Sequence, residues 1–122
     1  MKYLILIYSS PQTWNSMSQE ERDEVVREHV ALEQELIASG EYLGGNALAD
    51  SAQGKMITYA DDKPIITDGP FIGTKEHLAG YDVIECASPE RALEVALRNP
   101  HARLDGIELR PIMDLGGTEM CM

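Results

Sequence analysis

Cysteine is scarce in this chain of 122 residues, which has only Cys86 and Cys121. Two cysteines cannot build a disulfide framework, and neither stands at a Cys/His spacing typical of a metal site. Cys86 lies in an apolar run, which favours a buried and unreactive thiol. No phosphate-binding loop, dinucleotide fingerprint or Gly-x-Ser-x-Gly turn is present either. The sequence therefore predicts no bound metal and no cofactor.

Basic residues are also few: ten lysines and arginines stand against 21 acidic residues, for a formal net charge of −11. Such a surface repels phosphate backbones and anionic lipid. No segment approaches the roughly 20 apolar residues of a membrane-spanning helix, and the apolar run at residues 2–8 is too short for a signal-peptide core. We therefore expect a cytoplasmic protein that binds neither nucleic acid directly nor a membrane.

What the chain does contain is an ordered series of strand and helix patterns. Residues 2–8 are rich in β-branched and aromatic side chains, which indicates a strand. A helix is expected after Ser18, which opens a capping box, and it ends at Gly40. A second helix follows Ser88 and stops before Pro100. Further strands are expected at residues 42–48, 55–59, 64–67, 80–87 and 106–112.

Two helices that interrupt a strand-rich chain predict an α+β fold of the ferredoxin-like type, an antiparallel sheet with both helices on one face. The other face is then uncovered in a single chain. Large exposed apolar patches are rare on soluble monomers, and a second copy can cover one. We therefore expect a homodimer. Residues 1–113 form its single domain, and residues 114–122, which carry no pattern, are expected to be a flexible tail.

The segment at residues 68–71 (Asp-Gly-Pro-Phe) is the most unusual local feature of the sequence. Pro70 fixes its own φ and disfavours a helical backbone at Gly69. The carboxylate of Asp68 can accept a backbone N–H and close a turn. The polar residues that follow are therefore expected on a shaped loop.

Four motifs in order carry a family resemblance: residues 68–71, Thr-Lys-Glu at 74–76, Gly-Tyr at 80–81 and Glu-Leu-Arg-Pro-Ile at 108–112. Together they resemble the signature of the YCII-related proteins of the DGPF type, and the resemblance runs from Met1 to about Met113. It implies the ferredoxin-like fold in its dimeric α/β-barrel form. Gly73 departs from the pattern, because members of that family commonly carry an acidic residue there.

His29 and Asp68 are the candidate catalytic residues. Val25, His29, Leu32 and Leu36 recur at helical spacing, which places an imidazole in the apolar stripe of the first helix. One interpretation is a core histidine with satisfied ring nitrogens, and the other is an acid–base group. The resemblance also implies a histidine on this helix. Asp68 either caps its own turn, or orients His29 or a ligand hydroxyl.

Four more residues are candidates for substrate binding. Lys75 and Glu76 are adjacent, so on an extended segment one faces a pocket while the other faces water; both can equally be solvated. Arg110 can bind a carboxylate bidentately or pair with an acid of the signature. Tyr81 is expected to line the sheet, with a phenol contact to ligand as the alternative. His101 is expected in a surface loop.

These residues support two functional hypotheses. In the first, His29 transfers a proton, Asp68 orients it, and Arg110 or Lys75 anchors a small hydroxy- or oxo-acid in a cofactor-independent enzyme. In the alternative, the protein is a non-catalytic regulatory or protein-binding partner. Proteins of the DGPF type are often described with extracytoplasmic-function sigma factors, so the resemblance suggests a link to transcription. An acidic surface suits a basic protein partner.

Overall fold

The computed structural model describes residues 1–69, 77–117 and 119–120. Its strands and helices follow the chain in this order: β1 (Lys2–Ser9), α1 (Pro11–Ser16), α2 (Gln19–Ser39), β2 (Tyr42–Ala47), the 3-10 helix η1 (Ser51–Gln53), β3 (Lys55–Ala60), β4 (Lys63–Asp68), β5 (His77–Glu85), α3 (Pro89–Leu97), the 3-10 helix η2 (Pro100–Arg103) and β6 (Ile107–Pro111). The predicted strands and both predicted long helices are confirmed. The short helix α1 was not predicted.

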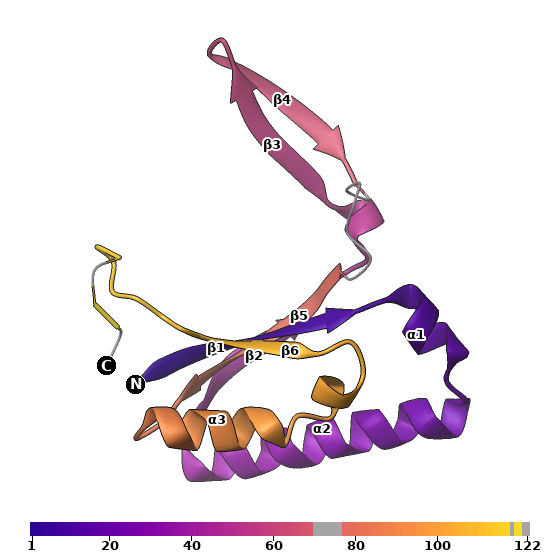
Figure 1. Cartoon of the computed structure of the whole chain (residues 1–122), viewed down its shortest axis with the longest axis vertical. Helices are drawn as coiled ribbons and strands as arrows, with labels where there is room; N and C mark the ends of the chain where they lie inside the picture. The colour runs from indigo at the N-terminus through magenta and orange to yellow at the C-terminus, as the bar shows by residue number, and fades with distance from the viewer. Residues whose placement is uncertain (70–76, 118, 121–122) are drawn as a thin grey trace.

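Four strands form an antiparallel sheet in the order β2-β5-β1-β6. Helices α2 and α3 lie side by side against one face of this sheet (Figure 1). The strands that are central in the sheet, β1 and β5, come from opposite halves of the chain. This order is that of the split βαβ arrangement, so the ferredoxin-like α+β fold is confirmed.

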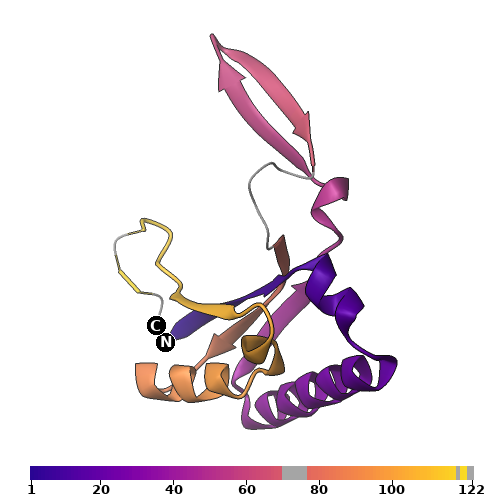
Figure 2. The same ribbon diagram turned by 45° about the vertical axis from the view of Figure 1, so that its right-hand side comes forward.

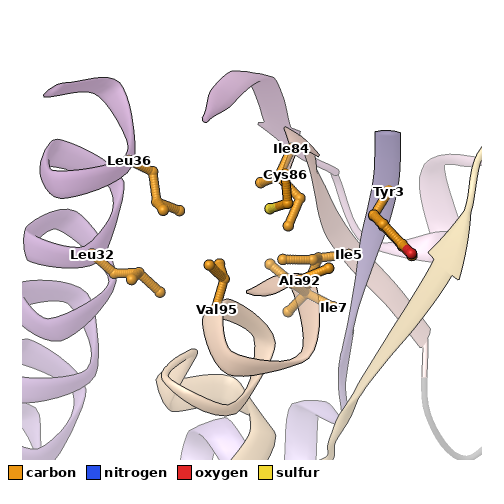
Figure 3. Close-up of a cluster of buried hydrophobic side chains, with 9 residues drawn as sticks. All are labelled: Tyr3, Ile5, Ile7, Leu32, Leu36, Ile84, Cys86, Ala92 and Val95. Carbon is orange, nitrogen blue, oxygen red and sulfur yellow. The ribbon is translucent and has the colours of Figure 1, made fainter. Parts of the chain in front are cut away.

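The core lies between the helices and the sheet (Figure 3). Along β1, every second residue faces the helices, and Tyr3, Ile5 and Ile7 are buried there. Leu32 and Leu36 of α2 pack against the same cluster. The remaining members of the cluster are Ile84, Cys86, Ala92 and Val95. The apolar stripe of the first helix, which the sequence predicted, therefore holds α2 on the sheet.

Strands β3 and β4 form a separate two-stranded hairpin that projects away from the main sheet (Figures 1 and 2). Asp61 and Asp62 have φ values of 51° and 63° and make the turn between the two strands. Every residue of both strands is exposed in the single chain. A two-stranded hairpin on its own is marginally stable in water, and this one exposes apolar side chains such as Ile57 and Ile66.

Met120, close to the end of the chain, lies against the domain. Met113 and Met120 form an isolated antiparallel bridge, and Met120 packs against the core. The flexibility expected of residues 114–122 stays a prediction. No helix in the described part of the chain is both long enough and apolar enough to span a membrane.

Candidate functional site

A cavity of about 360 Å³ opens between α2 and the adjoining strands β2 and β5. Ile7 of β1 and His101 of η2 complete its lining. Aliphatic side chains form part of the wall. The polar residues of the lining are His29, Glu33, Tyr42, Asn46, Tyr81, Asp82 and His101. This volume is at the lower end of small-molecule pockets, which span about 300–1,000 Å³.

His29 and Asp82 face each other in this cavity. Nε2 of His29 lies 3.8 Å from Oδ2 of Asp82, and the two side chains are only 23% and 14% exposed. Nδ1 of His29 is buried and has no hydrogen-bond partner among the described residues. A separation of 3.8 Å is too long for a direct hydrogen bond. A water or a ligand hydroxyl between the two groups can bond to both.

The sheet register explains why Asp82 points towards the helices. Asp82 on β5 stands directly opposite Ile5 on β1, and directly paired residues share a face of the sheet. Ile5 is buried in the core, so Asp82 faces the same layer. On its other side Asp82 pairs with Gly45 of β2. A Cβ at Gly45 would lie 2.4 Å from Oδ1 of Asp82, so only glycine leaves room for this carboxylate.

Tyr42 holds the second oxygen of the same carboxylate. Its hydroxyl donates to Oδ1 of Asp82 at 3.4 Å. Burial, followed by the negative charges of Asp82 and Glu33, raises the pKa of Tyr42 to about 12. Tyr42 therefore keeps its proton at neutral pH and remains a donor.

The electrostatics of the cavity follow from its burial. Burial raises the pKa of Asp82, and Glu33 adds to this effect while the positive form of His29 and the hydroxyl of Tyr42 oppose it. A carboxyl whose pKa is raised can exchange a proton closer to neutral pH. Within the described residues, no group of three or more His, Cys, Asp and Glu side chains is placed to hold a metal ion.

His101 packs against His29 edge to face, with ring centroids 5.4 Å apart and 75° between the ring planes. Burial, and then the proximity of His29, lowers the pKa of His101 to about 4. The expectation of a surface loop residue is wrong for His101. The 3-10 helix η2 turns its ring back towards α2, and no pattern in the sequence indicates that contact.

Asp82 was also missed, although the sequence does contain a signal for it. Asp82 and Ile84 alternate along β5, Cys86 follows in the same phase directly after the strand, and Ile84 and Cys86 are buried. The period of two along a strand places all three on one face. A carboxylate in phase with two core residues therefore indicated a buried acid opposite the first helix.

Asp68 does not meet His29 within the chain. It ends β4, where its 75% exposed side chain forms an ion pair with Lys55 of β3. The pair joins the first residue of β3 to the last residue of β4, in the hairpin that projects away from the main sheet (Figure 1). The predicted convergence of Asp68 and His29 on one cavity is therefore corrected, and Asp82 takes the place beside the imidazole.

Of the other predicted site residues, one lines the cavity, one lies outside it, and two are not among the described residues. Tyr81 lines the cavity, and its hydroxyl accepts a hydrogen bond from Nδ2 of Asn46 at 2.8 Å. Arg110 lies on β6, where its exposed guanidinium pairs with Glu108 and does not line the cavity. Lys75 and Glu76 lie outside the described residues, as does Gly73.

Fold and site together define a ferredoxin-like α+β protein with a cavity that is lined by titratable residues. Residues 1–116 match the YCII-related domain, so the chain belongs to the YCII-related family. The narrower DGPF type stays a prediction. An uncharacterized protein of Rhizobium meliloti (strain 1021) is 30% identical over 114 residues, which are 92% of each chain.

A solved structure with a similar fold is the 5-chloro-2-hydroxyhydroquinone dehydrochlorinase TftG from Burkholderia phenoliruptrix, in complex with 2,5-dihydroxybenzoquinone. Its TM-score is 0.55 at 15% sequence identity, and the match covers 92% of this chain and 93% of that one. At this level of identity the likeness shows the fold alone.

Proposed function

We propose that this protein is a small enzyme in which His29 and Asp82 transfer protons on a small hydroxylated or carbonyl-bearing compound, without a cofactor. The observation that carries the proposal is the buried pair itself. Nε2 of His29 and Oδ2 of Asp82 are 3.8 Å apart in a cavity of ligand size, a gap that a ligand hydroxyl can bridge.

His29, Asp82 and Tyr42 have distinct roles in the proposed proton transfer. A ligand hydroxyl between the two groups donates a hydrogen bond to one and accepts one from the other. Tyr42 holds the second oxygen of Asp82 from the opposite side, which fixes the carboxylate during the transfer. Burial raises the pKa of Asp82, so that either member of the pair can take or return a proton. Asp82 thus carries the orienting role that the sequence had given to Asp68.

The reaction class that suits this arrangement is proton transfer coupled to elimination or isomerisation. The structural neighbour named above is a dehydrochlorinase with a hydroxylated quinone bound, which supports this class at the level of the fold. The alternative of a regulatory partner linked to a sigma factor stays a prediction.

The test uses 5-chloro-2-hydroxyhydroquinone as probe and measures chloride release against the spontaneous rate. We expect release by the wild type, and a loss of about a hundredfold or more in His29→Gln and in Asp82→Asn, because a positioned acid–base group contributes roughly 10²–10⁴-fold. His77→Gln, which removes a histidine outside the cavity, is the matched control. Equal rates in wild type and His29→Gln, with both folded by circular dichroism, contradict the proposal.

We also propose that the protein is a homodimer. Ile57 and Ile66 stand directly opposite each other in the hairpin and are each 63% exposed. Tyr59 and Pro64 form the next directly opposed pair on that face, and Tyr59 is exposed as well. A second copy of the chain that covers this face removes the apolar surface from water.

A further inference from the structure

The cavity that His29 lines contains carboxyl groups but no lysine or arginine among its described lining residues. Glu33 and Asp82 supply two carboxyl groups. Three arginines on or near these elements pair with other acids: Arg27 with Glu24, Arg98 with Glu35, and Arg103 with Glu28. None of these three arginines lines the cavity.

The two histidines of the lining, His29 and His101, do not make the cavity positive. His101 is neutral at neutral pH, because burial and the neighbouring His29 lower its pKa to about 4. His29 faces the carboxyl group of Asp82, which offsets a positive charge on its ring. Glu33 adds a second carboxyl group to the lining, and no lysine or arginine among the described lining residues offsets it.

The remaining wall is aliphatic. Ile7, Val26, Val30, Ala47 and Ala79 line the cavity together with Tyr42 and Tyr81. A volume of about 360 Å³ is sufficient for one substituted ring. Hydrogen-bonding groups gather around Asp82, where His29 and Tyr42 meet it. The cavity therefore combines one polar end with an apolar body.

From these observations we infer that the site selects an uncharged, hydroxylated one-ring compound and rejects its carboxylated counterpart, with Glu33 as the residue that discriminates. This inference rests on the proposed function and narrows it. It replaces the hydroxy- or oxo-acid expected from the sequence, for which Arg110 was a candidate anchor. Arg110 pairs with Glu108 outside the cavity, so no described cation is in place to receive a carboxylate.

A cationic ligand fits less well than a neutral one. An ammonium group loses its hydration among aliphatic walls, and it needs a free carboxylate to compensate. Asp82 already accepts a hydrogen bond from Tyr42 and faces His29. Of the two carboxyl groups in the lining, only the half-buried Glu33 is then left to compensate an ammonium group. A neutral hydroxyl needs only hydrogen bonds, which the polar end supplies.

Three probes that share one phenol ring and differ only in the para group test the inference: 4-hydroxybenzyl alcohol, 4-hydroxybenzoate and 4-hydroxybenzylamine. Their dissociation constants at pH 7 are measured by NMR titration of the wild type, with the histidine ring signals as reporters of the site. We expect the alcohol to bind about tenfold more tightly than the benzoate, the scale of like-charge repulsion at a partly buried site. The benzylamine is expected to bind more weakly than the alcohol.

The charge of Glu33 is then removed in Glu33→Gln, with Glu20→Gln as the matched control. Glu20 lies in the first turn of the same helix, and it does not line the cavity. We expect Glu33→Gln to reduce the preference for the alcohol over the benzoate to about threefold or less, while Glu20→Gln keeps the wild-type ratio.

The possible outcomes distinguish failure of the inference from failure of the proposed function. Tighter binding of benzoate or benzylamine than of the alcohol, at the His29 signals, overturns the inference and leaves the proposed site standing. An unchanged ratio in Glu33→Gln overturns the role of Glu33. Failure of all three probes to shift the histidine signals at millimolar concentration counts against the proposed site, and the inference falls with it.

Discussion

The rings of His29 and His101 meet edge to face, with their centroids 5.4 Å apart. They come from α2 and η2, and both residues line the cavity. Two imidazoles at this distance disfavour simultaneous protonation. The contact therefore couples the stability of the fold to pH.

The first prediction concerns acid stability. The pKa of His101 is about 4 in the folded protein against an ordinary value of 6.5, so the unfolded chain takes up a proton first as the pH falls. The stability that the neutral ring contributes is complete above pH 6.5 and is lost as the pH falls towards 4. In His101→Gln this component is absent, so urea midpoints should fall less steeply between pH 7 and 4.5 than in the wild type. An NMR titration of the His101 ring with a midpoint near 6.5 contradicts the prediction.

The second prediction concerns the ion pair between Glu41 and Arg91. Nε and one terminal nitrogen of Arg91 each donate to a different oxygen of Glu41 at 2.9 Å. This bidentate pair ties the start of α3 to the residue that precedes β2, and it lowers the pKa of Glu41 to about 2. Arg91→Ala should lower the melting temperature by about 5 °C.

Arg98→Ala is the matched control for Arg91→Ala. Arg98 pairs with Glu35 at an exposed position, and exposed pairs contribute little. Its melting temperature should stay within about 2 °C of the wild type. Equal losses in the two variants mean that the Glu41 pair has no special role. Thermal unfolding followed by circular dichroism distinguishes the two results.

The third prediction concerns the space that Gly45 leaves for the site. A Cβ at this position lies 2.4 Å from Oδ1 of Asp82 and 2.9 Å from the hydroxyl of Tyr42. Gly45→Ala should therefore displace Asp82, cost about 1–3 kcal/mol of unfolding free energy through overpacking, and abolish probe binding. Chemical denaturation and the NMR titration measure the two effects.

Gly40→Ala is the matched control for Gly45→Ala, because it replaces a glycine without filling space near Asp82. Gly40 ends α2 with φ of 81°, and nothing lies within 4 Å of an added Cβ. Alanine there costs about 1 kcal/mol of backbone strain, with probe binding unchanged. Retained binding in Gly45→Ala shows that Asp82 does not depend on that space.

The fourth prediction concerns the homodimer. Light scattering at micromolar concentration should give a mass of twice the 13.5 kDa of the chain. Ile57→Glu places a carboxylate on the apolar face that Ile57 shares with Ile66, and it should shift the protein towards the monomer. Gln34→Glu adds the same charge at an exposed position of α2 and should leave the dimer intact. A monomeric wild type ends the proposal.

Local signals predicted the elements that depend on neighbouring residues. The capping box of Ser18 and Glu21 forms as expected, because its partners are three residues apart. Ser88 and Pro89 likewise begin α3. The same pair of signals at Ser10 and Pro11 begins α1, a helix that was not predicted from the sequence. A helix of six residues is too short to show an apolar period that distinguishes it from a loop.

The sequence by itself determined the order of strands and helices, the face of α2 that carries His29, and the negative charge of the chain. Each of these depends on residues a few positions apart or on composition alone. Only the tertiary structure decided that Asp82, and not Asp68, faces His29. The antiparallel pairing of β5 with β1 and β2 sets the face and the height of Asp82, while the hairpin removes Asp68 to its own ladder. Contacts of this kind join distant segments, and their geometry follows from the sheet register and the packing of helix on sheet.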